Sequence, residues 1–127
     1  MINIDDLIGV RYQVNGRSLK TGMDCYGLAI EVCKRMGHVL PDPDLLKKHF
    51  REFEKCEELI LNDVKVKQIT EPCKEGDLIL IKNAKGVVGH IGVYLDNGRF
   101  IHCNKDGVHI EKLIYYKNLI GRVYTWL

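Results

Sequence analysis

The stretch "HIGVYLDNGRFIHC" (90–103) contains two apolar runs that favour β-structure, with the turn sequence "DNG" between them. Such runs around an Asn-Gly pair predict a β-hairpin with one buried face on each strand. Runs of the same kind make the second half of the chain strand-rich. The predicted strands cover residues 64–69, 77–82, 88–95, 99–104, 108–113 and 122–127.

The length of the hairpin loop determines whether His90 and His102 lie on the same face of the sheet. A two-residue Asn-Gly loop would place His90 and His102 on opposite faces. A three-residue loop with a left-handed Gly98 would instead pair His102 with Gly92, which leaves space between the histidines, and would put Asn104 on their face. Two histidines acting together therefore require the three-residue loop. The alternative is a pair of satisfied histidines on a sheet face.

The first half of the chain has helical periodicity. Residues 24–36 predict a helix that Gly37 ends, and its apolar stripe consists of Leu28, Ala29, Val32 and Met36. Residues 3–9 and 44–59 predict two further helices, and 15–22 a polar loop. Helices followed by strands indicate an α+β domain with a mainly antiparallel sheet of five to six strands. We assign residues 1–127 to one domain.

Composition excludes several classes of protein. The chain has 127 residues, of which 46% are hydrophobic and 28% charged, with a net charge of +2, so no basic surface for nucleic acid is expected. No apolar run reaches the ~20 residues of a membrane span. The beginning lacks the pattern of a secretory signal, so we expect a cytoplasmic protein, or one that leaves in a larger assembly.

Five cysteines without CxxC spacing favour neither disulfides nor a zinc ribbon, and we expect no cofactor and no metal.

Cys25 follows Asp24 at the predicted start of a helix. Asp24 suits the N-cap position, and the helix N-terminus would lower the pKa of a thiol in the first turn. Gly27 would leave room for a substrate beside the sulfur. Most free cysteines are simply buried, so the helix alone does not make Cys25 a nucleophile. A nucleophile needs a histidine base, and His90 and His102 fit better than His38, His49 and His109, which we expect at the surface.

These segments together resemble the NlpC-type cell-wall cysteine peptidases, a bacterial branch of the papain-like fold. "DCYGL" (24–28) is similar to the family's Asp-Cys-Ser-Gly-Leu, and "HIGVYLDNGRFIHC" is similar to its histidine motif. "EGDLILI" (75–81) and "GVRYQVNGR" (9–17) also resemble family segments in the expected order. The resemblance implies a papain-like NlpC-type fold, with N-terminal helices packed on the sheet.

The resemblance also implies roles for single residues. Cys25 would be the nucleophile, His90 its general base and His102 the residue that orients His90. Tyr12 matches the family tyrosine that helps to stabilise the oxyanion, together with the backbone N–H of Cys25. Asn104 is a reserve for the orienting role. Asp24, Tyr26 and Asn104 would line the substrate groove.

The chain departs from the family pattern near the groove. Tyr26 replaces the usual serine, and Val14 and Asn15 replace Trp-Gly. Residues 12–44 are closest to the phage-tail branch of the family, which implies tail proteins as partners and the virion as a destination.

The implied function is hydrolysis of an amide in the peptidoglycan stem peptide, after D-γ-glutamyl. Two alternatives stay open at this point. One is a structural or wall-binding tail subunit with little turnover. The other is a zinc site formed by Cys25, His90 and His102.

Overall fold

A six-stranded antiparallel sheet forms the centre of the computed structural model, which describes residues 2–43, 53–72 and 74–127. The strand order is β3-β8-β4-β5-β6-β7, and every neighbouring pair is antiparallel. The strands are β3 (Val66–Ile69), β4 (Leu78–Lys82), β5 (Val88–Tyr94), β6 (Arg99–Asn104), β7 (Gly107–Lys112) and β8 (Ile120–Trp126). All the predicted strands are confirmed, with ends that shift by one or two residues.

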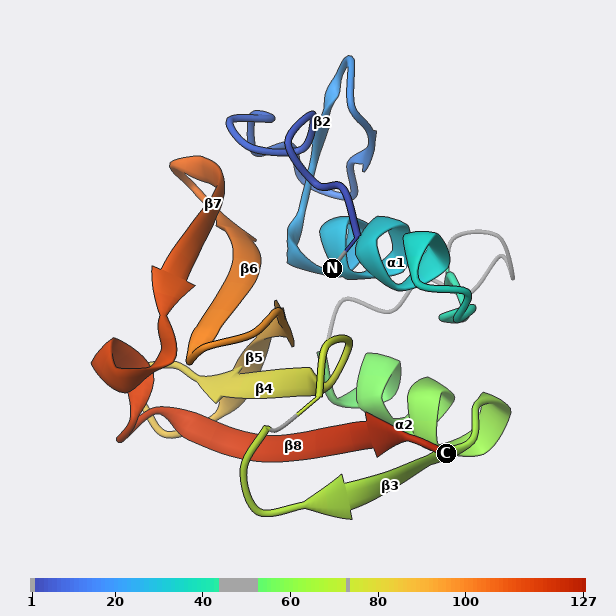
Figure 1. Ribbon diagram of the computed structural model, residues 1–127, viewed down its shortest axis with the longest axis vertical. Coiled ribbons are helices and arrows are strands. Elements are labelled where there is room, and N and C mark those ends of the chain that lie inside the picture. The colour runs from blue at the N-terminus through green and yellow to red at the C-terminus, as the bar shows by residue number, and fades with distance from the viewer. Residues whose placement is uncertain (1, 44–52, 73) are drawn as a thin grey trace.

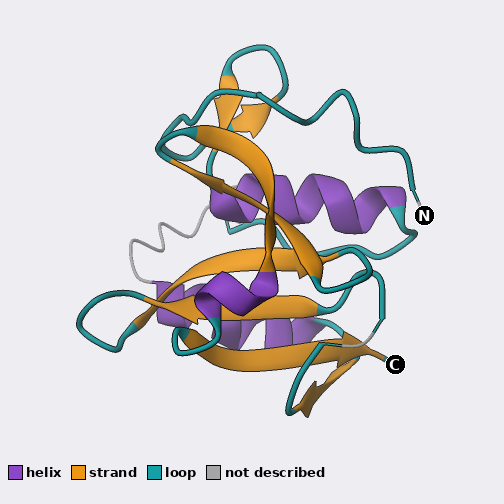
Figure 2. Ribbon diagram, turned by 60° about the vertical axis from the view of Figure 1, so that its left-hand side comes forward, coloured by secondary structure: helices purple, strands orange, loops and turns teal. Residues whose placement is uncertain are grey.

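Two helices pack on this sheet, α1 (Cys25–Arg35) and α2 (Phe53–Asp63). Figure 1 shows α1 beside the N-terminal segment and α2 behind β4 and β8, and Figure 2 shows β6 and β7 curving from the sheet toward α1. The main core joins the buried face of α1 to the strands, with Leu28, Val32, Ile60 and Ile91 fully enclosed. The α+β prediction is therefore confirmed. No helix in the described ranges is long and apolar enough to cross a membrane.

Helix α1 begins and ends with local signals that its sequence encodes. The carboxylate of Asp24 accepts a hydrogen bond from the N–H of Gly27 at 2.7 Å, which caps the first turn. At the other end Gly37 adopts a left-handed φ of +86°, and the N–H of His38 bonds to the carbonyl of Cys33. Asp24 therefore fixes where α1 starts and which side chains occupy its first turn.

Other predicted helices differ from the structure. The predicted helix over 3–9 is absent: residues 5–9 form turns, because the segment is too short to sustain a helix, and Ile4 and Leu7 still bury their side chains in the core. The prediction over 44–59 is confirmed only from Phe53 onward, since residues 44–52 lie outside the described ranges. The polar loop over 15–22 contains a two-stranded hairpin of β1 (Arg17–Ser18) and β2 (Gly22–Met23). A short 3₁₀ helix, η1 (Leu113–Tyr116), links β7 to β8.

The β5–β6 hairpin has the three-residue loop. The N–H of Leu95 bonds to the carbonyl of Arg99 at 2.9 Å, and Gly98 has a φ of +74°. His102 consequently pairs with Gly92, as predicted for this loop. A Cβ on Gly92 would lie 2.6 Å from the ring of Phe100, so the space at this glycine is occupied by that ring.

Candidate active site

A cleft of about 390 Å³ opens between the start of α1 and the strands β5 and β6. Every predicted site residue except His102 lines this cleft, namely Tyr12, Asp24, Cys25, Tyr26, His90 and Asn104. His102 lies behind His90 and is only 1% exposed. The fold thus brings the helix cysteine and the hairpin histidines to one place.

A hydrogen-bonded series runs from the cleft into β7. Nε2 of His90 lies 2.7 Å from Nδ1 of His102, and Nε2 of His102 lies 2.9 Å from Oε2 of Glu111. An ionised carboxylate only accepts hydrogen bonds, so Nε2 of His102 carries a proton and its Nδ1 accepts one. His90 then donates through Nε2. Its Nδ1 is left with a free lone pair that can accept a proton.

The charge states of His90, His102 and Glu111 follow from their burial and from their hydrogen-bonding partners. Burial raises the pKa of Glu111, but hydrogen bonds from Tyr116 and His102 outweigh it and hold the pKa below its usual value. Burial lowers the pKa of His102, although the bond to Glu111 opposes this change. Burial, followed by the fields of His102 and His109, lowers the pKa of His90 to about 4. At neutral pH the series is one carboxylate and two neutral imidazoles.

Cys25 occupies the first position of α1, as predicted, and is half-buried at the cleft. Burial raises the pKa of its thiol to about 12, although backbone hydrogen bonds from Ile91 and Tyr26 favour the thiolate. The prediction of a lowered thiol pKa is therefore wrong for the resting structure, because desolvation exceeds the effect of the helix N-terminus. Among the described residues no hydrogen bond joins Cys25 to His90. The resting cleft accordingly contains a neutral thiol and a neutral imidazole.

Gly27 has a role different from the one predicted. A Cβ at this position would collide with the carbonyl oxygen of Gly16, in the turn that leads into β1. Gly27 therefore allows α1 to pack against the β1–β2 hairpin and does not serve substrate access. Arg17 reinforces this junction, since its guanidinium lies 2.9 Å from Asp24 and 3.2 Å from Asp42.

Tyr26 mainly holds α1 in position and contributes little exposed surface to the substrate groove. It lines the cleft, but its side chain is only 4% exposed and its hydroxyl donates a hydrogen bond to the carbonyl of Pro41 at 2.5 Å. The guanidinium of Arg17 lies 5.9 Å from the centre of its ring. The bulky residue at this position therefore ties the start of α1 to the turn that follows the helix.

The other predicted cleft residues vary in how they face it. Tyr12 is half-buried, and burial followed by the fields of Asp24 and Cys25 raises the pKa of its hydroxyl. Asn15 also lines the cleft, whereas Val14 is 64% exposed. The side-chain oxygen of Asn104 accepts a hydrogen bond from the N–H of Asp106.

This hydrogen bond holds the Asn104 side chain within the turn between β6 and β7. Among the described residues no hydrogen bond joins its side chain to His90, so its reserve role in orienting that ring is not supported. Asn104 remains a residue of the cleft wall.

Glu111 was missed by the sequence reasoning, because the register between β6 and β7 brings it to the site. β6 and β7 are joined by a two-residue turn that pairs Asn104 with Gly107, and this register pairs His102 with His109. Alternation along a strand then puts Glu111 on the same face as His109. His109 is half-buried there, so it is only in part the surface residue that was predicted.

Two further histidine predictions concern residues outside the cleft. His38 stacks on the ring of Trp126, with ring centres 4.3 Å apart, instead of being solvated. His49 lies outside the described residues.

Comparisons with known proteins agree with this geometry. The model of the "NlpC/P60 family" matches residues 9–123. The murein DD-endopeptidase MepH of Escherichia coli K12 is 30% identical over 106 residues, which cover 82% of this chain and 35% of that protein. The chain thus spans about a third of the length of this curated relative.

Solved structures show the same fold. An NLP/P60 family protein similar to lipoprotein, from Staphylococcus aureus Mu50, has a TM-score of 0.64 at 26% identity over 94% of this chain and 39% of that chain. The NlpC/P60 domain of the peptidoglycan hydrolase SagA has a TM-score of 0.60 at 17% identity, over 94% and 89% of the two chains. Since the family model covers most of its length, the chain belongs to the NlpC/P60 family.

Proposed function

We propose that this protein is a cysteine peptidase that hydrolyses an amide bond in the stem peptides of peptidoglycan. The observation that carries the proposal is the hydrogen-bonded series His90–His102–Glu111, which begins in the cleft that Cys25 also lines. Membership of the NlpC/P60 family supports the same chemistry. Residues 1–127 would act as a single catalytic domain.

In the acylation step, Sγ of Cys25 attacks the carbonyl carbon of the scissile amide while Nδ1 of His90 takes the thiol proton. Both groups are neutral in the resting structure, so proton transfer accompanies the attack instead of preceding it. The oxyanion would receive hydrogen bonds from the backbone N–H of Cys25 and from Tyr12. The intermediate then expels the amine, which takes the proton from His90, and a thioester remains on Cys25.

In the deacylation step, a water molecule attacks the thioester carbonyl and Nδ1 of His90 takes one of its protons. Collapse of this second intermediate breaks the bond to sulfur, releases the carboxylic acid and returns the proton to Cys25. Throughout both steps His102 and Glu111 hold the His90 ring in one tautomer. They stabilise the imidazolium form that appears twice in each cycle.

Two stem-peptide bonds are candidates. The resemblance to the NlpC-type peptidases favours the bond after D-γ-glutamyl. Similarity to a relative described as a DD-endopeptidase favours a bond between two D-configured centres. A linear stem peptide and a cross-linked dimer separate the candidates, because mass spectrometry of the products identifies the cut bond.

The test of the mechanism uses the same substrates with purified wild-type protein and Cys25→Ala. We expect the wild type to release cleaved peptides and Cys25→Ala to release none. Cys33→Ala is the matched control, since Cys33 is buried in α1 away from the cleft. Activity that survives in Cys25→Ala would contradict the proposed nucleophile.

A second candidate function is a wall-binding tail subunit with little turnover. The raised pKa of Cys25 and its missing hydrogen bond to His90 favour this candidate. It predicts that Cys25→Ala sediments with purified sacculi as well as the wild type does, while neither protein releases peptides. The resemblance of residues 12–44 to the phage-tail branch makes the virion the proposed location for either function, which antibody detection in purified tails would test.

A further inference from the structure

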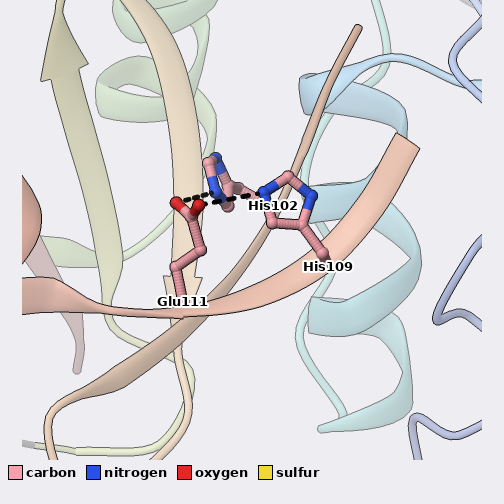
Figure 3. Close-up of side chains that lie close together, drawn as sticks. All are labelled: His102, His109 and Glu111. Carbon is pink, nitrogen blue, oxygen red and sulfur yellow. Dashed lines mark hydrogen bonds and ion pairs between the residues drawn. The ribbon is translucent and has the colours of Figure 1, made fainter. Parts of the chain in front are cut away.

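A cluster of three potential metal ligands lies on the side of His102 that faces away from His90. His109 pairs with His102 across β6 and β7, and Glu111 lies two residues farther along β7. One ligand atom from each of these residues lies within 4.8 Å of the other two. Figure 3 shows the Glu111 carboxylate pointing at both imidazole rings.

The tautomer of His109 makes this cluster unusual. Nδ1 of His109 lies 3.0 Å from the carbonyl oxygen of Gly107, which can only accept, so Nδ1 carries the proton. When His109 carries only this proton, the lone pair of its Nε2 faces Oε1 of Glu111 at 3.3 Å. Two acceptors that face each other at this distance repel unless a cation lies between them. A backbone carbonyl that fixes Nδ1–H is also the usual support of a metal-binding imidazole.

The chemistry of the three ligands suits a particular class of cation. Two imidazoles and one carboxylate form a set that binds Zn²⁺ and similar divalent transition metals, with water at the remaining position. His102 is buried, whereas His109 and Glu111 are each about 30% exposed on the solvent side. A metal ion could therefore enter from solvent without passing through the cleft.

The geometry points to a regulatory site in which His102, His109 and Glu111 bind a divalent transition metal of the zinc type. This site differs from the zinc alternative of Cys25, His90 and His102, because it shares only His102 with it. Its regulatory effect rests on the proposed peptidase function, whereas metal binding itself does not.

Metal binding would reverse the order of protons in the histidine pair. A metal ion on Nε2 of His102 displaces the proton there, so a neutral His102 carries its proton on Nδ1 and donates to Nε2 of His90. His90 then keeps its own proton on Nδ1, and the pair still holds two N–H protons in total. Because Nδ1 of His90 is no longer free, it cannot accept the proton of Cys25. The metal form would be inactive.

The binding test titrates zinc chloride into the full chain by equilibrium dialysis with elemental analysis. We expect one zinc ion per chain in the wild type and in Cys25→Ala. Outer-shell partners alone are worth about 10- to 100-fold in affinity, so loss of a direct ligand in His109→Gln should weaken binding by at least about 100-fold. Gln keeps the bulk of the side chain, and thermal unfolding of the metal-free variant verifies that it folds.

Three results of this titration would overturn the site. Equal affinity in His109→Gln and wild type would exclude His109 as a ligand. Loss of binding in Cys25→Ala would move the metal to the cleft. Absence of binding by the wild type would refute the metal site.

The regulatory test measures peptide release with and without zinc. We expect zinc to abolish activity in the wild type but not in His109→Gln, with each protein compared with its own metal-free activity. Nitrogen NMR should show the proton of His90 moving from Nε2 to Nδ1 as zinc binds to the wild type. Full activity of zinc-saturated wild type would overturn the regulation. If no protein cleaves peptides, the proposed function fails, and the titration and NMR still decide the metal site.

Discussion

Oε2 of Glu111 lies 2.9 Å from Nε2 of His102, which joins the edge strand β7 to a buried imidazole. The contact fixes the proton of His102 on the nitrogen that faces β7. Through the 2.7 Å bond to His90 it leaves Nδ1 of His90 free. An edge-strand carboxylate therefore determines which nitrogen can act as a base in the cleft.

Replacing Glu111 with glutamine should remove its effect on the tautomers of His102 and His90. The amide of Glu111→Gln can offer its nitrogen to His102, which then accepts at Nε2 and places its proton on Nδ1. Loss of the correct histidine tautomer costs about 10⁴-fold in kcat in a serine protease, so a fall of about 10²- to 10⁴-fold is expected here. Steady-state kinetics on a defined stem peptide would measure it.

The control for this change is Glu31→Gln. Glu31 forms an ion pair with Arg35 on α1, so its loss removes a similar charge away from the histidines. We expect wild-type activity in the control and nitrogen NMR signals of a changed tautomer only in Glu111→Gln. Equal activity of the two variants would show that Glu111 does not position His102.

The raised pKa of Cys25 predicts slow alkylation of the resting protein. A thiol whose pKa lies near 12 has far less thiolate at pH 7 than free cysteine, whose pKa is about 8.5. The iodoacetamide rate at Cys25 should therefore be below that of free cysteine at pH 7, and should still rise where free cysteine reaches its plateau. Peptide mass spectrometry would follow this one site across pH 6 to 11. A plateau already at about pH 6 would instead indicate a preformed thiolate–imidazolium pair.

Gly27→Ala should destabilise the protein, although alanine favours a helix by about 1 kcal/mol over glycine. The new Cβ would collide with the backbone of Gly16 and force α1 away from the β1–β2 hairpin. Overpacking of this kind costs about 1–3 kcal/mol. Urea unfolding would measure the loss. Gly89→Ala is the control, because a Cβ there meets open space, and a stability unchanged by both substitutions would refute the packing role.

Tyr26→Phe should lower the free energy of unfolding by about 1 kcal/mol. The variant keeps the buried ring but loses the hydrogen bond to Pro41, so a partly buried carbonyl is left without that partner. The matched control is Tyr115→Phe, whose side chain is 73% exposed and should tolerate the change. Thermal and urea unfolding of both variants would compare them, and equal stability would argue that the bond to Pro41 contributes nothing.

Sequence reasoning succeeded where the determinants of structure are local. Asp24 encodes the start of α1. For "DNG" the sequence narrowed the loop to two lengths and gave the histidine register that each would produce, and the structure has the three-residue loop with a left-handed Gly98. The β1–β2 hairpin was missed because strands of two residues show no periodicity. The role of Gly27 was missed because its neighbour Gly16 approaches only in the folded chain.

The electrostatics of the cleft were harder to predict for a related reason. The helix N-terminus at Cys25 is visible in the sequence and favours a low thiol pKa. The desolvation that raises this pKa depends on how α1, β5 and the surrounding segments pack. Glu111 similarly becomes part of the site only through the register between β6 and β7.

Cys25 lies far from His90, His102 and Glu111 along the chain, and this separation in sequence has a consequence for how the protein folds. His90, His102 and Glu111 lie on consecutive strands joined by tight turns, so their contacts are local and close quickly. Cys25 meets them only when α1 docks on the sheet from much earlier in the chain, which is a slower, non-local event. The base is thus expected to assemble first and the nucleophile last, so a partly folded chain would be unable to cut anything.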